Sequence, residues 1–237
     1  RLSIDTTFVN SRETSALLAA IRPETALLVL ESPSSGYMEV LDVPALADGA
    51  RQRGVRTLFD NSWASPCFQR PLELGVDLVV HSATKYLNGH SDVVAGAVIG
   101  REESLRAAVF DQVEYAGATL DPFAAWLMIR GLRTLPLRMR QHERSARAVA
   151  ELLASHLRVS RVNWPGLPGD PGHELARRQM SGFAGLLSFV PSEQTREAVF
   201  AFLARLRLFQ QGGSWGGVQS PALGREVLAP GRGRGEG

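Results

Sequence analysis

The chain has 237 residues, of which 44% are apolar and 21% charged, so it can bury a core in one large domain or two modest ones. Its 26 basic and 24 acidic side chains give a net charge of only +2, which disfavours a nucleic-acid partner. The single cysteine, Cys67, excludes an internal disulfide, and no apolar run approaches the roughly 20 residues that span a bilayer, so we expect a cytoplasmic protein without a membrane partner.

The first half of the chain alternates short apolar segments with helical patterns. A helix is expected from Pro44 to Arg53, because proline suits a first helical turn and Gly54 follows as a stop signal. Four apolar runs predict strands at 26–30, 55–59, 77–81 and 93–99. This alternation predicts an α/β fold with a mainly parallel sheet, in which ligands bind beyond the carboxyl ends of the strands. Asp60 and Lys85 each follow such an end.

Long helical patterns replace these elements from Asp121 onward. An apolar stripe from Met128 to Leu153 predicts one long helix with a kink at Pro136. His142 lies on the stripe, and we interpret it as a packed histidine rather than a metal ligand, since no ligand-type residue follows four positions later. Further strands are expected at 159–163 and 186–190, and further helices at 174–180 and 195–206.

These patterns divide the chain into three parts. We expect an α/β cofactor-binding domain over residues 1–131 and a smaller C-terminal α+β domain over 132–217. Residues 218–237 are rich in glycine, proline and arginine without periodicity, which favours a disordered tail over the alternative of a short arginine-glycine RNA-binding segment.

Lys85 is the only lysine of the chain, and the other 25 basic residues are arginines. A lysine amine can lose its proton and attack a carbonyl to form an imine, which an arginine does not do. The alternative is an ordinary surface cation. Ser82 and Thr84 place hydroxyls just before Lys85, where hydroxyls and backbone amides can together bind a phosphate. A phosphate next to an imine-forming amine suggests pyridoxal phosphate as the cofactor.

Asp60 is the candidate acid for the ring nitrogen of such a cofactor. A carboxylate there keeps the pyridinium protonated, so that the ring withdraws electrons from the substrate. The alternative for Asp60 is a turn cap together with Asn61. Of the remaining candidates, Cys67 is expected to be a structural thiol and His90 a loop hydrogen-bonding residue, while Tyr86 is as suited to packing as to chemistry.

Four strings of the sequence resemble the Cys/Met-metabolism family of pyridoxal-phosphate enzymes, from about Ile4 to Gly217. They are ESPSSGYMEVLDVPAL, FDNSWASPCFQRPLELGVDLVVHSATKYLNGHSDVVAGAVIG, GATLDPFAAWLMIRGLRTLPLRM and HELARRQMSGFAGLLSF. The resemblance implies the fold-type-I pyridoxal-phosphate transferase-like fold, with helices on both faces of the sheet. It also implies a homo-oligomer, either a dimer or a tetramer.

The resemblance assigns roles to individual residues. Lys85 would form the covalent imine with pyridoxal 5'-phosphate, and Asp60 would pair with its ring nitrogen. Two residues would bind the cofactor phosphate, namely Ser82 and Thr84. Three would bind the amino-acid substrate, namely Ser35, Ser214 and Trp215. No metal is expected.

Two strings, SPSSGY and SWGG, resemble the cystathionine β-lyase branch of the family. That branch implies β-elimination of L-cystathionine, a small amino-acid thioether, to homocysteine, pyruvate and ammonia in methionine biosynthesis. The alternatives are the γ-synthase and γ-lyase reactions of the same family, or an inactive fragment. Family chains carry a further segment before the equivalent of Arg1, and the pattern is lost after Gly217. We therefore expect a chain truncated at both ends that turns over poorly alone.

Overall fold

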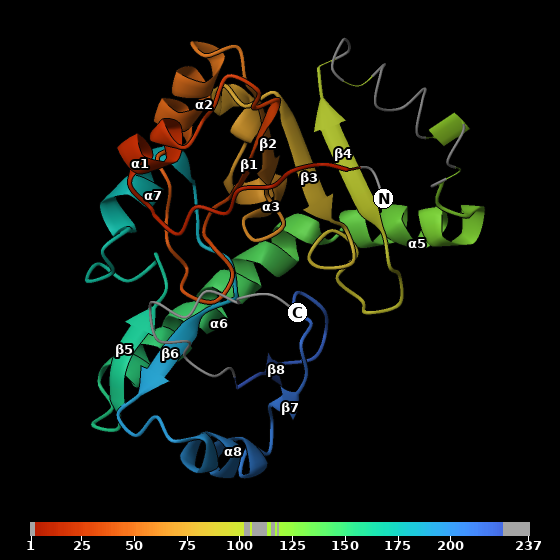
Figure 1. Ribbon diagram of the computed structural model, residues 1–237. Coiled ribbons are helices and arrows are strands. Elements are labelled where there is room, and N and C mark those ends of the chain that lie inside the picture. The colour runs from red at the N-terminus through yellow and green to blue at the C-terminus, as the bar shows by residue number, and fades with distance from the viewer. Residues whose placement is uncertain (1–2, 102–104, 106–112, 115–116, 118, 225–237) are drawn as a thin grey trace.

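A four-stranded sheet forms the centre of the first half of the protein (Figure 1). The strands are β1 (Leu27–Glu31), β2 (Arg56–Asp60), β3 (Leu78–Ser82) and β4 (Gly96–Gly100), adjacent in that order. The first three are parallel and β4 runs antiparallel to β3, which confirms the expected mainly parallel sheet. The computed structural model describes residues 3–101, 105, 113–114, 117 and 119–224.

Short helices connect the parallel strands. Helix α2 (Val43–Arg51) joins β1 to β2, while α3 (Ser65–Phe68) and the 3-10 helix η1 (Pro71–Leu74) join β2 to β3. Helix α2 begins where the Asp42 carboxylate accepts a hydrogen bond from the Ala45 N–H at 3.2 Å, as expected of a capping residue.

The sheet buries one of its faces. Leu30, Phe59 and Val79 form a core cluster with Leu46 of α2 and Leu17 of α1 (Thr14–Ala19). The three strand residues are partners in the sheet register, so their side chains point to the same side of the sheet. On the opposite face Val29 and Val98 are 63% and 54% exposed. That face is therefore open at β1 and at β4.

The helices of the second half differ from the expected single kinked helix. Helix α5 (Pro122–Leu132) ends before helix α6 (Leu135–Ala154) begins, with Pro136 in the first turn of α6. Proline lacks the N–H that an interior helical position needs, but a first turn does not use that donor. The proline therefore starts a second helix instead of bending one helix.

The remaining elements follow α6 along the chain. They are β5 (Val159–Asn163), α7 (His173–Gln179), β6 (Ser188–Pro191), α8 (Arg196–Ala204), β7 (Gln210–Gln211) and β8 (Pro221–Ala222). Strands β5 and β6 pair antiparallel beside α6, and β7 pairs parallel with β8 (Figure 1).

Strand β8 lies within the stretch expected to be disordered, so that expectation is wrong for 221–222, and residues 225–237 lie outside the described part. Within the described residues, no helix is long and apolar enough to cross a membrane.

A second core cluster contains residues from both sides of the predicted boundary at residue 131. Tyr86 and Leu87 follow β3, whereas Met139, Trp164 and Phe183 come from the second half, and all five are buried in this cluster. The two predicted domains therefore share apolar packing next to Lys85. The division at residue 131 remains a prediction.

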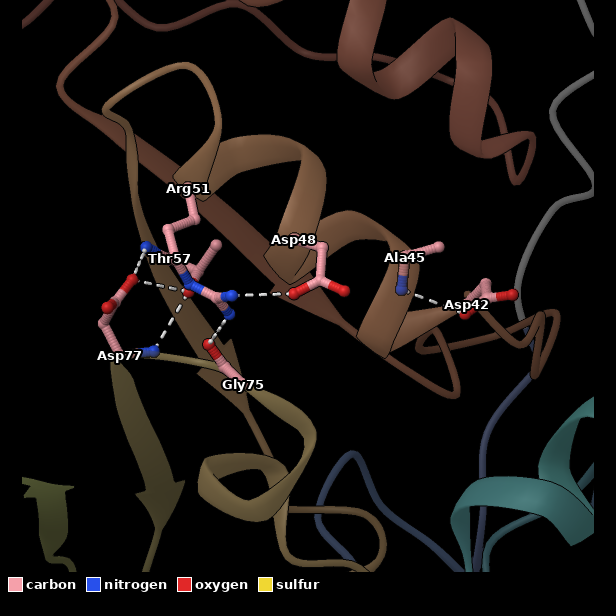
Figure 2. A network of polar contacts seen from close by, with 7 residues as sticks. All are labelled: Asp42, Ala45, Asp48, Arg51, Thr57, Gly75 and Asp77. Atoms are coloured by element: carbon pink, nitrogen blue, oxygen red, sulfur yellow. Dashed lines mark hydrogen bonds and ion pairs between the residues drawn. The ribbon is translucent and has the colours of Figure 1, made fainter.

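A polar link joins the amino ends of β2 and β3 (Figure 2). The Asp77 carboxylate accepts hydrogen bonds from the Thr57 N–H at 2.7 Å and from the Thr57 hydroxyl at 2.8 Å, and the Asp77 N–H donates back to that hydroxyl at 3.0 Å. Nearby, Arg51 contacts Asp48 at 2.8 Å and the Gly75 carbonyl at 3.3 Å. Since Thr57 is buried, this link fixes how the two strands that carry Asp60 and Lys85 lie next to each other.

We predict that Thr57→Val lowers the free energy of unfolding by about 1–3 kcal/mol, because the half-buried Asp77 carboxylate loses its hydroxyl donor. Urea denaturation of the chain measures this loss. The matched control is Thr7→Val, at an exposed threonine, which should leave the free energy of unfolding unchanged. Equal stability of the two variants would contradict the role of the link.

Candidate functional site

Lys85 lies in a tight turn directly after β3. Its N–H donates to the Ser82 carbonyl at 3.0 Å, and its carbonyl accepts from the Gly89 N–H at 2.8 Å. The Asn88 N–H closes the turn by donating to the Ala83 carbonyl at 2.9 Å. The lysine therefore sits at the carboxyl end of a sheet strand, as the sequence predicts.

The Lys85 amine meets a turn from the far end of the chain. Its Nζ donates a hydrogen bond to the Ser214 hydroxyl at 3.0 Å and lies 5.3 Å from the centre of the Trp215 ring. A cation this close to an indole ring is attracted by the ring's electrons. The structure thus brings together three of the residues singled out from the sequence.

Tyr86, the residue after the lysine, packs against two aromatic rings. Its ring contacts the rings of His142 and Trp215 edge to face, at 5.0 and 5.3 Å between centres. Its hydroxyl accepts a hydrogen bond from the Gly185 N–H at 2.9 Å, and burial raises the pKa of the phenol. Of the two roles considered for Tyr86, this geometry favours packing. His142 is likewise a packed helix histidine, as expected.

The segment that binds Tyr86 is held by two further aromatic residues. The Trp164 indole donates to the carbonyl of Ala184 at 2.9 Å, and the Trp63 indole donates to that of Leu186 at 3.0 Å. Both tryptophans are buried. Residues 184–186 are therefore fixed on each side of the Gly185 N–H, which fixes the Tyr86 hydroxyl in turn.

Asp60 ends β2, next to the strand that leads to Lys85. It pairs with Val80 of β3 in the sheet register and is half-buried. One carboxylate oxygen accepts the Ser62 N–H at 2.8 Å, which is the turn-capping bond considered as the alternative. The capping role is therefore present, and a role towards a cofactor nitrogen remains a prediction that would use the other oxygen.

The two candidate phosphate ligands differ in their surroundings. The Thr84 hydroxyl contacts the Ala95 backbone twice, donating to the carbonyl at 3.3 Å and accepting from the N–H at 3.0 Å. It thereby ties the lysine turn to the segment before β4. Among the described residues, none forms a hydrogen bond with the Ser82 hydroxyl. The Ser82 N–H donates to the Ser62 hydroxyl at 2.6 Å. Ser82 is therefore the more available of the two for a phosphate.

Ser35 lies apart from this group in its contacts. Its hydroxyl and N–H both donate to the Glu31 carboxylate at the end of β1. It lines a cavity of about 320 Å³ together with Tyr37 and Glu39, and neither Lys85 nor Asp60 lines that cavity. No described contact joins Ser35 to the lysine, so its substrate role remains a prediction.

The side chains at the ends of β2 and β3 fit pyridoxal phosphate by their chemistry. The Lys85 amine suits the aldehyde, the Asp60 carboxylate suits the ring nitrogen, and the Ser82 hydroxyl suits the phosphate. All three stand at the carboxyl edge of adjacent parallel strands, where ligands of such sheets bind. Within the described residues, no cluster of three metal-ligating side chains occurs.

Sequence reasoning missed Arg138, which donates to the Tyr86 carbonyl at 2.7 Å. It also missed Gly185, the residue whose N–H binds the Tyr86 hydroxyl. A backbone donor leaves no signal in side-chain chemistry. Arg138 stands in the quoted string RTLPLRM, where nothing distinguishes it from the other arginines of the chain.

The chain matches the family described as Cys/Met metabolism PLP-dependent enzyme over residues 1–223. It is 44% identical over 220 residues to a cystathionine gamma-synthase of Mycobacterium bovis, covering 93% of this chain. It is 43% identical over 204 residues to a cystathionine beta-lyase of Lactococcus lactis subsp. cremoris, covering 86%. A crystal structure of cystathionine gamma synthase from Xanthomonas oryzae pv. oryzae in complex with cystathionine superposes with a TM-score of 0.85 at 42% identity, over 90% of this chain.

These matches cover only part of each relative. The chain spans about half the length of the curated relatives it matches, 56% of the synthase and 53% of the lyase, and 55% of the solved structure.

We predict that the protein loses stability as the pH falls below about 6.5, the usual histidine pKa. Burial, reinforced by the charge of Arg138, lowers the pKa of His142 in the folded protein. The unfolded chain then binds a proton that the folded chain disfavours, so the stabilising effect is present at neutral pH and lost on acidification. Unfolding measured from pH 7.5 to 5 should show this loss.

His142→Phe keeps a ring against Tyr86 but does not titrate, so its stability should depend less on pH. Some dependence should remain, because burial also lowers the pKa of His81. The control is His156→Gln, at an exposed histidine, and its stability should change with pH as that of the unaltered protein does. A pH profile that His142→Phe leaves unaltered would argue against this assignment.

Proposed function

The chain belongs to the Cys/Met-metabolism family of pyridoxal-phosphate-dependent enzymes, and from this premise we propose that it cleaves a carbon–sulfur bond of an amino-acid thioether at Lys85. The observation that carries the proposal is the contact of the Lys85 amine with Ser214 and Trp215. In this contact Lys85, which would bind the cofactor, lies next to the turn that the resemblance assigns to the substrate. The amine is thus aimed at the place where a substrate would lie.

Each residue of the site has a defined task in this proposal. The bound cofactor supplies a ring that accepts the electron pair left at the substrate's Cα carbon. Asp60 holds the proton on the ring nitrogen through the carboxylate oxygen that does not accept the Ser62 N–H. The Lys85 amine removes the Cα proton and passes it to the departing sulfur, and the Ser214 hydroxyl orients the amine by accepting its hydrogen bond.

We propose β-elimination of L-cystathionine as the reaction. The Cα–H and Cβ–S bonds break, a carbon–carbon double bond forms, and the sulfur takes the proton and leaves as homocysteine. Water then converts the three-carbon remainder to pyruvate and ammonia. A single acid–base group is enough for this sequence, and within the described residues Lys85 is the only amine near the Ser214–Trp215 turn.

A γ-type reaction is the second candidate, supported by the 44% identity to a cystathionine gamma-synthase. Such a reaction also moves a proton at Cβ, and it ends in 2-oxobutyrate when no second substrate is added. The family permits both outcomes, so the keto acid formed is the measurement that separates them.

Assembly and location follow the same proposal. Phe123 and Trp126 stack on each other on α5 while 66% and 53% exposed, which supports burial of this helix face in a homodimer or tetramer. A cytoplasmic place in methionine biosynthesis remains a prediction.

We predict that pyridoxal phosphate forms a covalent adduct with the chain at Lys85 and that borohydride reduction makes this adduct permanent. Because Lys85 is the only lysine, peptide mass mapping distinguishes it from the one other primary amine, at Arg1. Lys85→Arg keeps the positive charge but cannot make the bond, so it should yield no adduct beyond that at Arg1. A label on a residue other than Lys85 and Arg1, or equal labelling of Lys85→Arg and the unaltered chain, would overturn the assignment.

The reaction itself is tested by incubating the chain with cofactor and L-cystathionine and identifying the keto acid formed. We expect pyruvate, at a low rate. Formation of 2-oxobutyrate would show that the chain performs the γ-type reaction and not β-elimination. Absence of any keto acid, together with a normal adduct at Lys85, would show that the chain binds the cofactor but is an inactive fragment.

A further inference from the structure

The turn that carries Lys85 leaves two of its carbonyl groups without a partner inside the turn. The Lys85 and Ala83 carbonyls accept bonds from the N–H groups of Gly89 and Asn88, but among the described residues no backbone N–H donates to the carbonyls of Tyr86 and Leu87. Both residues are buried, and a buried carbonyl without a donor is costly.

Arg138 supplies the missing donors from helix α6. One terminal nitrogen of its guanidinium, Nη1, donates to the Tyr86 carbonyl at 2.7 Å, and the other, Nη2, donates to the Leu87 carbonyl at 3.4 Å. A single side chain thereby holds the two residues that directly follow the lysine.

The guanidinium is itself fixed at the junction of α5 and α6. Its Nη2 also donates to the Gly131 carbonyl at 2.8 Å, and its Nε donates to the Thr134 hydroxyl at 3.0 Å. All three nitrogens of Arg138 are used in four bonds. The planar fork of arginine has donors in these directions, whereas a lysine has one ammonium that cannot reach the same set.

Two glycines make room for this contact. A Cβ atom at Gly89 would lie 2.0 Å from Nη1 of Arg138, and the residue has a positive φ of 71°. A Cβ atom at Gly131 would lie 2.3 Å from the Asn88 carbonyl oxygen. The turn, the helix junction and the guanidinium are therefore in closer contact than any larger residue at these two positions permits.

We propose that Arg138 is the positioning residue for Lys85, holding the lysine turn in the geometry that aims the amine at the Ser214–Trp215 turn. The inference rests on the proposed function of Lys85 as the residue that binds the cofactor. Arg138 touches neither the amine nor the substrate position, and it acts only through the backbone of residues 86 and 87. Orientation of this kind affects a reaction rate steeply, because the amine must approach its target along one direction.

The test compares Arg138→Lys with the unaltered chain in two measurements. Hydrogen exchange of the Asn88 and Gly89 amides reports the order of the turn without cofactor, and we expect it to accelerate at least about tenfold, since charge-assisted bonds are lost. The rate of adduct formation with pyridoxal phosphate at one fixed pH reports the orientation of the Lys85 amine and should fall about tenfold by the same loss. It is measured on the borohydride-reduced peptide that carries Lys85, because each arginine-to-lysine variant adds a second lysine amine. Arg140→Lys, at an exposed arginine of the same helix, should change neither.

Thr134→Val is the second variant, because it removes the acceptor of the Nε–H, together with the bond of the Thr134 hydroxyl to the Gly131 carbonyl at 3.1 Å, and leaves the charge of Arg138 in place. If Arg138→Lys melts well below the unaltered chain, Thr134→Val serves as the test of the proposal. We then expect a smaller acceleration of amide exchange and a smaller fall of the adduct rate. Unchanged exchange and unchanged adduct rate in a variant that melts normally would overturn the proposal. If the unaltered chain forms no adduct, the proposed function fails, and the exchange measurement still decides whether Arg138 orders the turn.

Discussion

The burial of Tyr86 is the interaction on which the arrangement around Lys85 depends. A phenol taken out of water needs a hydrogen-bond partner, and the backbone N–H of Gly185, nearly a hundred residues away along the chain, supplies one at 2.9 Å. Since Tyr86 directly follows Lys85, satisfying the phenol also fixes the lysine relative to the second half of the protein. The residue that packs, Tyr86, and the residue that carries the amine, Lys85, are thus consecutive in the chain.

This requirement explains why the second core cluster includes aromatic side chains that carry a polar atom. Trp63 and Trp164 each bury a large ring and still bind a carbonyl next to Gly185. Leucine at either position would fill space but would leave that carbonyl without its indole donor and residues 184–186 free to shift. The direction of the Gly185 N–H is therefore determined by side chains from both halves of the chain.

Much of the fold follows from local patterns, because apolar runs of strand length and proline or capping residues act within a few positions. The strands that end at Asp60 and Ser82, and the lysine turn beyond them, are examples. The break between α5 and α6 was missed because the apolar stripe continues across residues 133–134 whereas the helix does not. Strand β8 was missed because its pairing partner, not its composition, makes it a strand.

The site shows the same division between local and distant information. The residue types at 60, 82 and 85 indicate cofactor chemistry by themselves, and the family match supports that interpretation. That the Thr84 hydroxyl is engaged by Ala95, and that Arg138 rather than another arginine turns inward, depends on three-dimensional contacts. A single sequence does not indicate which distant residues come into contact.

The contact between Lys85 and Ser214 spans 129 positions of the chain, which has a consequence for synthesis on the ribosome. The sheet and the lysine turn emerge before the hydroxyl and indole that meet the amine, and domains generally fold in the order of their synthesis. For that interval the nascent chain exposes a reactive amine with no partner from the Ser214–Trp215 turn. The order of translation therefore gives small aldehydes access to Lys85 before the substrate side of its site exists.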